Sequence, residues 1–375
     1  MFPADNFIKT ILDKRKTEDL FRSLRFSDNL IDFCSNDYLG FARSQTLKDR
    51  ISVFSLIDDN HKIGSTGSRL LNGNYPFYED LEKKIATYHN ATSGLIFNSG
   101  YDANTSLLSS LSNENDTVIY DELIHASVHD GMRLSKASRI KFSHNNTIHL
   151  KELLSKAKGN IYVVVESVYS MDGDFAPLIE IVNLCVKYQG NLIVDEAHAT
   201  GIFGEKGRGR VSELNLEDKV FARIHTFGKG MGCNGAIILG SDLLKDYLIN
   251  FARPFIYTTA LPFPNLVAIH CAYDLLEKSD EEISKLKSLI QLFKNNINNK
   301  NILLIKSESP IQCIIIEGNK ESREASKKLQ SLGFDVRAIL SPTVPKGKER
   351  LRICLHSFNT ENQIDSLSKA IADLF

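Results

Sequence analysis

A lysine in the glycine-rich segment HTFGKGMG is the residue of this chain best suited to covalent chemistry. Lys229 follows an apolar run, 220–227, that predicts a buried strand, and Gly230, Gly232 and Gly235 come after it. These glycines leave the backbone unobstructed, so a ligand could approach the amine. On its own, such a lysine is more often a phosphate contact or a solvated residue than a covalent one.

The segment LIVDEAHATG adds a carboxylate and an imidazole after a second apolar run. Asp195 ends the run 192–194, and His198 stands three residues later. Pyridoxal phosphate needs an amine for its aldehyde, a carboxylate facing its pyridine nitrogen and a donor near its phenolic oxygen. Lys229, Asp195 and His198 can fill these roles, so they predict a site for this cofactor.

Two nucleotide-binding motifs share letters with these segments, and neither fits. DEAH is also a helicase box, but a helicase requires the pattern G-x-x-x-x-G-K-[ST]. Arg223 stands where the first glycine belongs, and Gly230 stands where Ser or Thr belongs. The glycines 230, 232 and 235 match a dinucleotide fingerprint, but the following AIILG predicts a strand where a helix is needed.

Five apolar runs end in polar residues, and this pattern predicts the sheet that positions the site. The runs are GLIF before Asn98-Ser99-Gly100-Tyr101, TVIY before Asp121 and His125, IYVVV before Glu166, Ser167 and Ser170, LIV before Asp195 and His198, and ARIHTF before Lys229. Predicted helices separate most of them, which favours an α/β fold with a largely parallel sheet. Ligand groups of such sheets gather beyond the carboxyl ends of the strands, so all five clusters should face one crevice.

Two of these clusters allow a functional and a structural interpretation. Ser99, Gly100 and Tyr101 open a predicted helix, whose free N–H groups suit a phosphate, but Ser99 could equally be an N-cap without a ligand. His125 could stack on a flat ring, although a histidine near a strand end is more often a packed or surface residue.

Length and composition predict a protein of two lobes. The chain has 375 residues, of which 42 % are hydrophobic and 24 % charged, as in ordinary soluble globular proteins. We expect an N-terminal arm over 1–45, a large domain over 46–262 and a smaller C-terminal α/β domain over 263–375. In the smaller domain, Arg352 lies on the last predicted strand, where either a surface ion pair or carboxylate binding fits.

The charge balance and the cysteines indicate which kinds of ligand the protein binds and in which cellular compartment it works. The chain has 45 Lys and Arg against 46 Asp and Glu, so nothing favours nucleic acid or an anionic membrane, and we expect a small ligand. Six scattered cysteines without a CxxC pair predict free thiols in a reducing compartment and no metal site. Without a signal segment or a long apolar run, we expect a cytoplasmic protein.

Nine motifs together resemble the pyridoxal-phosphate-dependent α-oxoamine synthases, over nearly the whole chain and in the family's order. They are NDYLG, GSTGSRLLNG, SGYDAN, DELIHAS, ESVYSMDGD, DEAHATGIFGEKGRG, TFGKG, FARPFIYTTALP and SPTVPKGKERLR. The resemblance implies the aspartate aminotransferase-like fold, fold type I of pyridoxal phosphate enzymes. It also implies that Lys229 bonds to the cofactor aldehyde, Asp195 pairs with the pyridine nitrogen, His198 meets the phenolic oxygen and His125 stacks on the ring.

The resemblance implies further residues around the cofactor phosphate and the substrates. The phosphate would be surrounded by Ser99, Gly100, Tyr101 and Thr226. Thr258 or Thr259 would reach the phosphate from the partner subunit of a homodimer. Arg352, helped by Asn36, would hold an amino-acid carboxylate. The remaining lining residues would be Ser170, Glu166 and Thr343.

The implied reaction is a condensation of an amino acid with an acyl thioester, with loss of carbon dioxide. DEAHATG and TFGKG favour L-alanine with a pimeloyl thioester, carried by CoA or by a carrier protein, over glycine with acetyl-CoA. Arg22 or Arg25 would meet the pimeloyl carboxylate. Tyr78 and Phe263 replace a histidine and a proline common in the family, which alters the acyl entrance. The intact lysine site argues against a non-catalytic partner subunit.

Overall fold

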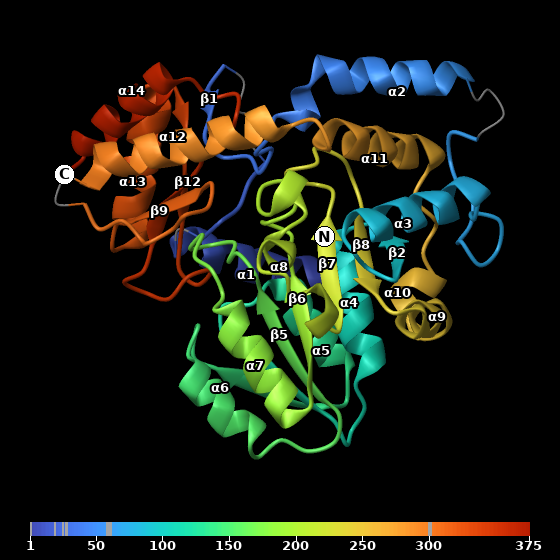
Figure 1. Cartoon of the computed structure of the whole chain (residues 1–375). Helices are drawn as coiled ribbons and strands as arrows, with labels where there is room; N and C mark the ends of the chain where they lie inside the picture. Colours follow the sequence, from blue (N-terminus) through green and yellow to red (C-terminus); the bar gives the residue numbers. More distant parts are fainter. Residues whose placement is uncertain (1, 19, 25, 27–28, 58–61, 299–301) are drawn as a thin grey trace.

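The chain forms a large twisted sheet flanked by helices, with a smaller sheet in its C-terminal part (Figure 1). The computed structural model describes all residues except 1, 19, 25, 27–28, 58–61 and 299–301. No helix in these described residues has the length and apolar character needed to cross a membrane.

Seven strands make up the large sheet, in the order β2-β8-β7-β6-β5-β3-β4. Their bounds are β2 Ser93–Phe97, β3 Thr117–Asp121, β4 Ser138–Phe142, β5 Ile161–Glu166, β6 Gly190–Asp195, β7 Ala222–Thr226 and β8 Ala236–Gly240. β8 is antiparallel to both of its neighbours, and all other pairs are parallel. β2 therefore runs in the same direction as β7, and the polar segments after β2, β3, β5, β6 and β7 lie along one edge. The prediction of a largely parallel sheet is confirmed.

Helices cover both faces of this sheet because alternate strand residues point to opposite sides. Val164 packs in the core beneath α4, α5, α9 and α10, whereas its neighbours Val163 and Val165 pack in the core beneath α6 and α7. The helices are α4 Gly100–Leu111, α5 Ala126–Leu134, α6 Thr147–Leu154, α7 Leu178–Tyr188, α8 Arg210–Glu213, α9 Asp242–Phe251 and α10 Arg253–Ile256. Both faces are buried, which explains why the strands are continuous apolar runs.

A further helical layer covers the β2 edge of the sheet (Figure 1). It contains α2 Gln45–Ile57, α3 Pro76–Tyr88 and α11 Phe263–Leu276. The next helix, α12 Asp280–Asn298, lies in the C-terminal part, where it packs against α14 Glu361–Ala372 (Figure 1). The predicted apolar face of α3, with Leu81, Ile85 and Tyr88, is buried in the largest hydrophobic core. Short 3₁₀ turns lie at η1 Phe41–Arg43, before α2, and at η2 Glu205–Gly207 and η3 Glu217–Lys219, between β6 and β7.

The C-terminal part is built on a three-stranded antiparallel sheet, with β12 between β11 and β9. Its elements are β9 Ile311–Ile315, α13 Asn319–Ser331, β10 Phe334–Asp335, β11 Arg337–Ile339, β12 Arg350–Cys354 and α14 Glu361–Ala372. From the other end of the chain, β1 (Ile31–Asp32) pairs in parallel with β10, while α1 (Pro3–Thr17) buries none of its residues. The division at residues 45 and 262 stays a prediction.

Candidate active site

The amine of Lys229 lies against the imidazole of His198, as the strand pattern predicts. The two residues follow the neighbouring parallel strands β7 and β6, and Lys229 Nζ is 2.8 Å from His198 Nε2. Burial lowers the pKa of the Lys229 amine, although the negative charges of Asp195 and Glu166 oppose the shift. A lysine with a lowered pKa is more readily neutral, which is the form that attacks a carbonyl or accepts a proton.

The carboxylate of Asp195 belongs to the same cluster and is held in place by two donors. Asn104 Nδ2 donates to its Oδ2 at 2.7 Å, and the backbone N–H of Ala197 donates to its Oδ1 at 2.9 Å. Asp195 pairs in register with Glu166 across β6 and β5. Burial, reinforced by the charge of Asp195, raises the pKa of Glu166.

A second group of side chains continues from His198 to the C-terminal sheet. Tyr38 places its hydroxyl 2.7 Å from His198 Nδ1 and 3.0 Å from Asn36 Oδ1. Arg352 donates from its terminal nitrogen to the same Asn36 oxygen at 2.9 Å, and from Nε to the carbonyl of Ser170 at 2.8 Å. The structure therefore brings Asn36, Ser170 and Arg352 next to the lysine cluster, where a carboxylate could bind the arginine.

His125 stands at the start of α5, within the electrostatic influence of the lysine cluster. Its Nδ1 accepts the backbone N–H of Ser127 at 3.2 Å and lies 2.7 Å from the hydroxyl of that serine, so it caps the helix. Burial lowers the pKa of His125, Lys229 lowers it further and Asp195 opposes both. A neutral ring with an exposed surface can stack on an aromatic ligand, so the role predicted for His125 fits its position.

The predicted phosphate contacts meet where β2 and β7 end. The hydroxyl of Ser99 accepts the backbone N–H of Asp102 at 3.0 Å, so Ser99 is the N-cap of α4. A Cβ placed on Gly100 would lie 3.3 Å from Thr226 Oγ1, so a larger residue would crowd that hydroxyl at the helix start. Asn98 Nδ2 donates to Thr258 Oγ1 at 3.2 Å within the same chain. Phosphate binding at this helix start stays a prediction.

Four predicted residues lie further from the lysine cluster. The side chain of Tyr101 is half-exposed, and its hydroxyl donates to Asp130. Arg22 and Thr343 line a separate groove of about 550 Å³ beside the C-terminal sheet. Thr259 is exposed, its carbonyl accepts an N–H of Asn98 at 2.8 Å, and its contribution to a partner stays a prediction. Arg25 lies outside the described residues.

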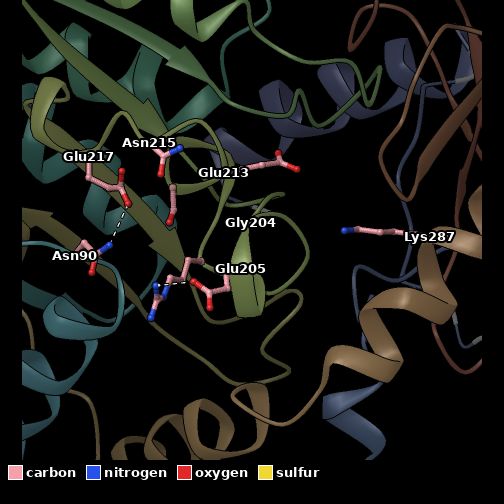
Figure 2. Close-up of a pocket in the computed structure, with 9 residues that line it drawn as sticks. Asn90, Gly204, Glu205, Glu213, Asn215, Glu217 and Lys287 are labelled. Atoms are coloured by element: carbon pink, nitrogen blue, oxygen red, sulfur yellow. Dashed lines mark hydrogen bonds and ion pairs between the residues drawn. The ribbon is translucent and has the colours of Figure 1, made fainter.

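The open pocket shown in Figure 2 lies apart from these groups. It measures about 440 Å³ and contains none of the predicted site residues. Glu205, Glu213 and Glu217 bring carboxylates to it, and Lys287 reaches in from α12. Asn90 Nδ2 donates to Glu217 at 3.3 Å, so part of this lining is already paired.

His144, Asp172 and Asp174 are spaced so that one metal ion could touch all three, with ligand atoms within 4.8 Å of one another. These groups already have partners in the protein. His144 bonds to Asp121 at 2.9 Å and to Asp174 at 2.7 Å, and Asp172 pairs with Arg350. The prediction that the chain has no metal site stays a prediction, and the cluster has a structural explanation without one.

Sequence reasoning missed two residues that hold the cluster together, Asn104 and Tyr38. Asn104 lies one helical turn after Gly100 in α4, so its side chain projects to the same edge as the helix start. Tyr38 belongs to NDYLG, whose neighbour Asn36 was identified. A polar side chain on a buried helix face is the one signal that could have singled out Asn104.

The residues present fit pyridoxal phosphate. An amine, an oriented carboxylate and an imidazole occur together, as the cofactor requires. Buried oxygens of Asn104 and Glu166 also lack hydrogen-bond partners within the described chain, although buried polar atoms normally have one. The site therefore has both the groups and the unused hydrogen-bonding capacity for a polar ligand.

Comparison with known proteins supports the family resemblance found in the sequence. The family model for aminotransferase class I and II matches residues 28–371. The chain is 45 % identical to 8-amino-7-oxononanoate synthase of Emericella nidulans, covering 91 % of this chain and 88 % of the relative. It is 38 % identical to the protein of the same name from Marinobacter nauticus, covering 98 % and 95 %.

Solved structures share the fold. The chain superposes on 8-amino-7-oxononanoate synthase of Francisella tularensis with a TM-score of 0.81 and 29 % identity, over 92 % of this chain and 98 % of the other. It superposes on serine palmitoyltransferase of Sphingomonas wittichii with a TM-score of 0.91, over 100 % and 98 %, and at 24 % identity this likeness shows the fold alone. The predicted fold is confirmed.

Proposed function

The chain belongs to the aminotransferase class I and II family, and from this we propose that it joins L-alanine to a pimeloyl thioester. The products are 8-amino-7-oxononanoate, carbon dioxide and a free thiol, in a step of biotin synthesis. The observation that best supports this proposal is the cluster of Lys229, His198 and Asp195 beside Arg352. It occurs in a chain that is 45 % identical to a relative named for this product.

Pyridoxal phosphate, when bound, supplies an aldehyde for amines and an electron-withdrawing ring that stabilises negative charge on a carbon atom. In this site Lys229 would hold its aldehyde end, and Asp195 would face its ring nitrogen. Asn104 and the N–H of Ala197 hold that carboxylate in one orientation, so its negative charge would stay next to the ring nitrogen. His125 and Ser99 would contact the ring and the phosphate.

Lys229 is the proton-transfer group of the proposed reaction. Because burial lowers the pKa of its amine, a larger fraction of Lys229 is neutral and can take the proton from Cα of alanine. The carbon then bonds to the thioester carbonyl as the C–S bond breaks, and the departing thiolate takes a proton from solvent. The alanine carboxylate leaves as carbon dioxide, and the proton held by Lys229 returns to the same carbon.

Arg352 is the anchor proposed for the alanine carboxylate. Its guanidinium is buried, and in the part of the chain that the structure describes its hydrogen bonds go to neutral acceptors, namely the carbonyl of Ser170, the amide of Asn36 and the thiol of Cys354. A buried cation without a carboxylate in contact gains most from an anionic ligand. This arrangement supports the binding of an amino acid at this point.

The groove that contains Arg22 and Thr343 is the site proposed for the acyl thioester. Arginine is the charged residue type that lines it, at Arg15, Arg22, Arg323 and Arg337, and apolar side chains such as Leu340 lie between them. A pimeloyl chain is apolar with a carboxylate end, and its CoA or protein carrier bears phosphate, so this lining suits both.

We also propose that the protein is cytoplasmic. We propose further that it forms a homodimer, in which Thr258 or Thr259 of one subunit completes the phosphate site of the partner. Sedimentation of the purified protein tests the dimer. A mixture of Lys229→Ala and Thr258→Val subunits tests the sharing, because shared sites would restore activity in the hybrid dimers. Hybrids without activity would show that each subunit uses its own threonines.

An assay of thiol release tests the proposed reaction. Purified protein is given alanine or glycine together with pimeloyl-CoA or acetyl-CoA, and carbon dioxide is measured in parallel. We expect turnover with alanine and pimeloyl-CoA, and one carbon dioxide for each thiol. Turnover confined to glycine and acetyl-CoA would overturn the proposal in favour of the sister reaction.

A further inference from the structure

Asn98 joins the two segments of this chain that contain the proposed phosphate contacts. It follows β2 and directly precedes Ser99, the N-cap of α4. Its side chain contacts the segment between α10 and α11, where Thr258 and Thr259 lie. In the proposed function, Ser99 contacts the phosphate in its own subunit, and one of the two threonines contacts the phosphate in the partner. Asn98 therefore lies between groups that are proposed for two different sites.

The contacts of Asn98 fix which way its amide points. The backbone carbonyl of Thr259 can only accept a hydrogen bond, and it lies 2.8 Å from Asn98 Nδ2. The same nitrogen has a second proton, which it donates to Thr258 Oγ1 at 3.2 Å. An amide turned the other way would place its oxygen against the Thr259 carbonyl with no proton between them. Asn98 is therefore the donor in both contacts.

This direction leaves the hydroxyl proton of Thr258 available. A hydroxyl has one proton to donate and two lone pairs with which to accept, and the Asn98 amide uses one of the lone pairs. Within the residues that the structure describes, Thr258 Oγ1 donates to no acceptor. Its proton can therefore go to an anionic oxygen outside the chain while the contact with Asn98 stays in place.

Thr259 differs from Thr258 in this respect. Its side chain is exposed, and Asn98 contacts its backbone carbonyl, so the amide does not orient the Thr259 hydroxyl. A side chain that is already held in place loses less freedom when it binds a ligand than a side chain that is not. The contacts of Asn98 thus favour Thr258 as the phosphate donor.

The backbone that follows the two threonines is anchored separately. The carbonyl of Leu261 accepts hydrogen bonds from the hydroxyls of Ser65, at 3.0 Å, and Tyr78, at 3.1 Å. Both contacts are buried, so this end of the segment has a fixed position. The remaining polar contact that places the Thr258 hydroxyl is the one with Asn98.

We propose that Asn98 is a positioning residue for the site of the partner subunit, because it holds Thr258 so that the hydroxyl proton reaches the phosphate bound there. This inference rests on the proposed function, which supplies the homodimer and the phosphate site. Asn98 is also bonded through the backbone to Ser99, which belongs to the site of its own subunit. One side chain thereby connects the two phosphate sites of the dimer.

Hybrid dimers with one working site test the proposal. One subunit carries Lys229→Ala and cannot bond to the cofactor, the other keeps Lys229, and different affinity tags allow the hybrids to be isolated. Borohydride fixes pyridoxal phosphate to Lys229, so mass spectrometry over a range of cofactor concentrations gives the affinity of the one remaining site. This measurement needs no substrate.

Asn98→Ala is then placed in one subunit of the hybrid or in the other. In the Lys229→Ala subunit, which supplies Thr258 to the working site, the variant should weaken cofactor binding by about tenfold, the order expected for one lost hydrogen bond. In the subunit that keeps Lys229, it should have little effect. An effect confined to that second subunit, equal effects in both, or no effect in either would overturn the proposal.

A matched control separates this role from a general effect on folding. Asn191→Ala removes another partly buried amide, whose Nδ2 donates to the carbonyl of Ile161 at 3.1 Å. Both residues lie where β5 and β6 begin, at the end of the sheet opposite to the proposed site. Cofactor affinity should therefore be unchanged in this variant, in either subunit, and an equal loss would show that the effect of Asn98→Ala is not specific.

The two threonines provide a test that holds even if Asn98→Ala does not fold. Thr258→Val and Thr259→Val are introduced separately into the Lys229→Ala subunit of the hybrid. Thr258→Val should weaken cofactor binding and Thr259→Val should not, because Asn98 orients the hydroxyl of Thr258 alone. The opposite result would refute the role given to Asn98.

The results also separate this inference from the proposed reaction. Hybrids that bind the cofactor as expected, in a protein that does not condense alanine with pimeloyl-CoA, would refute the reaction and leave the role of Asn98 intact. A protein that sediments as a monomer and still condenses the two substrates would overturn the role of Asn98, since no partner site would exist, and leave the reaction intact.

Discussion

Two partly or fully buried histidines of this chain, His198 and His144, have opposite charge states. His198 has cations nearby, and burial together with Lys229 and Arg352 keeps its pKa well below the usual value. Burial would also lower the pKa of His144, but the hydrogen bonds that its ring donates to Asp121 and Asp174 outweigh burial and raise the pKa to about 9. His198 is therefore neutral and can exchange a proton, whereas His144 is a cation at neutral pH.

The surroundings of the two residues match this difference. His198 lies between the amine of Lys229 and the hydroxyl of Tyr38, within the proposed reaction centre. His144 fixes Asp174, which lies in the loop that also supplies the carbonyl of Ser170 to Arg352. The same side chain thus serves chemistry in one place and loop structure in the other, and the neighbouring charges decide which.

The largest effect should come from removing the amine that faces His198. Lys229→Ala should lower condensation activity by roughly 1,000-fold or more, because both the attachment of the cofactor and the proton transfer depend on this amine. The visible absorbance that pyridoxal phosphate gives on the unaltered protein, and its bleaching by borohydride, should be lost as well. A coloured, active variant would contradict the assignment of Lys229.

Replacing the neutral histidine should affect chemistry more than stability. We expect His198→Gln to lower kcat by roughly 100-fold, the loss that a small displacement of reacting groups can cause, while the urea midpoint changes little. Steady-state kinetics and urea unfolding of the same preparation measure both. If stability falls and kcat does not, His198 is a structural residue and the comparison with His144 fails.

Replacing the charged histidine should have the reverse effect. His144→Gln leaves Asp121 and Asp174 without their cation and should reduce the free energy of unfolding by about 3 kcal/mol. Urea unfolding measures this loss. The matched control is His149→Gln, whose ring bonds to the exposed Ser143, and its change should stay within about 0.5 kcal/mol. Equal losses in the two variants would refute a special role for His144.

The stabilisation from His144 should depend on pH in a defined direction. Folding raises its pKa from 6.5 to about 9, so the contribution is fully present below pH 6.5 and is lost as the pH rises through 9. The stability gap between the unaltered chain and His144→Gln should therefore narrow by about 3 kcal/mol between these limits. A gap that is constant or widens over this range would show that His144 is not the titrating group.

Much of this arrangement is predictable from local sequence. The apolar runs before Ser99, Asp195 and Lys229 are strands of one sheet, and their shared direction brings these residues to one edge. Local patterns do not reveal the contacts of Asn104 with Asp195 or of Tyr38 with His198, since 91 and 160 residues separate the partners. Such pairs depend on how helices and loops pack over the sheet, which periodicity does not encode.

The pairing of β1 with β10 has a mechanical consequence for substrate binding. Ile31 and Asp32 are bonded to Phe334 and Asp335 on one side, and the N–H of Cys354 donates to the carbonyl of Phe33 at 2.8 Å on the other. The segment leading to Asn36 is thereby fastened to the sheet that carries Arg352. Any hinge motion of that sheet would therefore move Asn36 and Arg352, the two residues proposed to bind the alanine carboxylate, as one body. The contact between the Tyr38 hydroxyl and His198 would be the one that such a motion breaks.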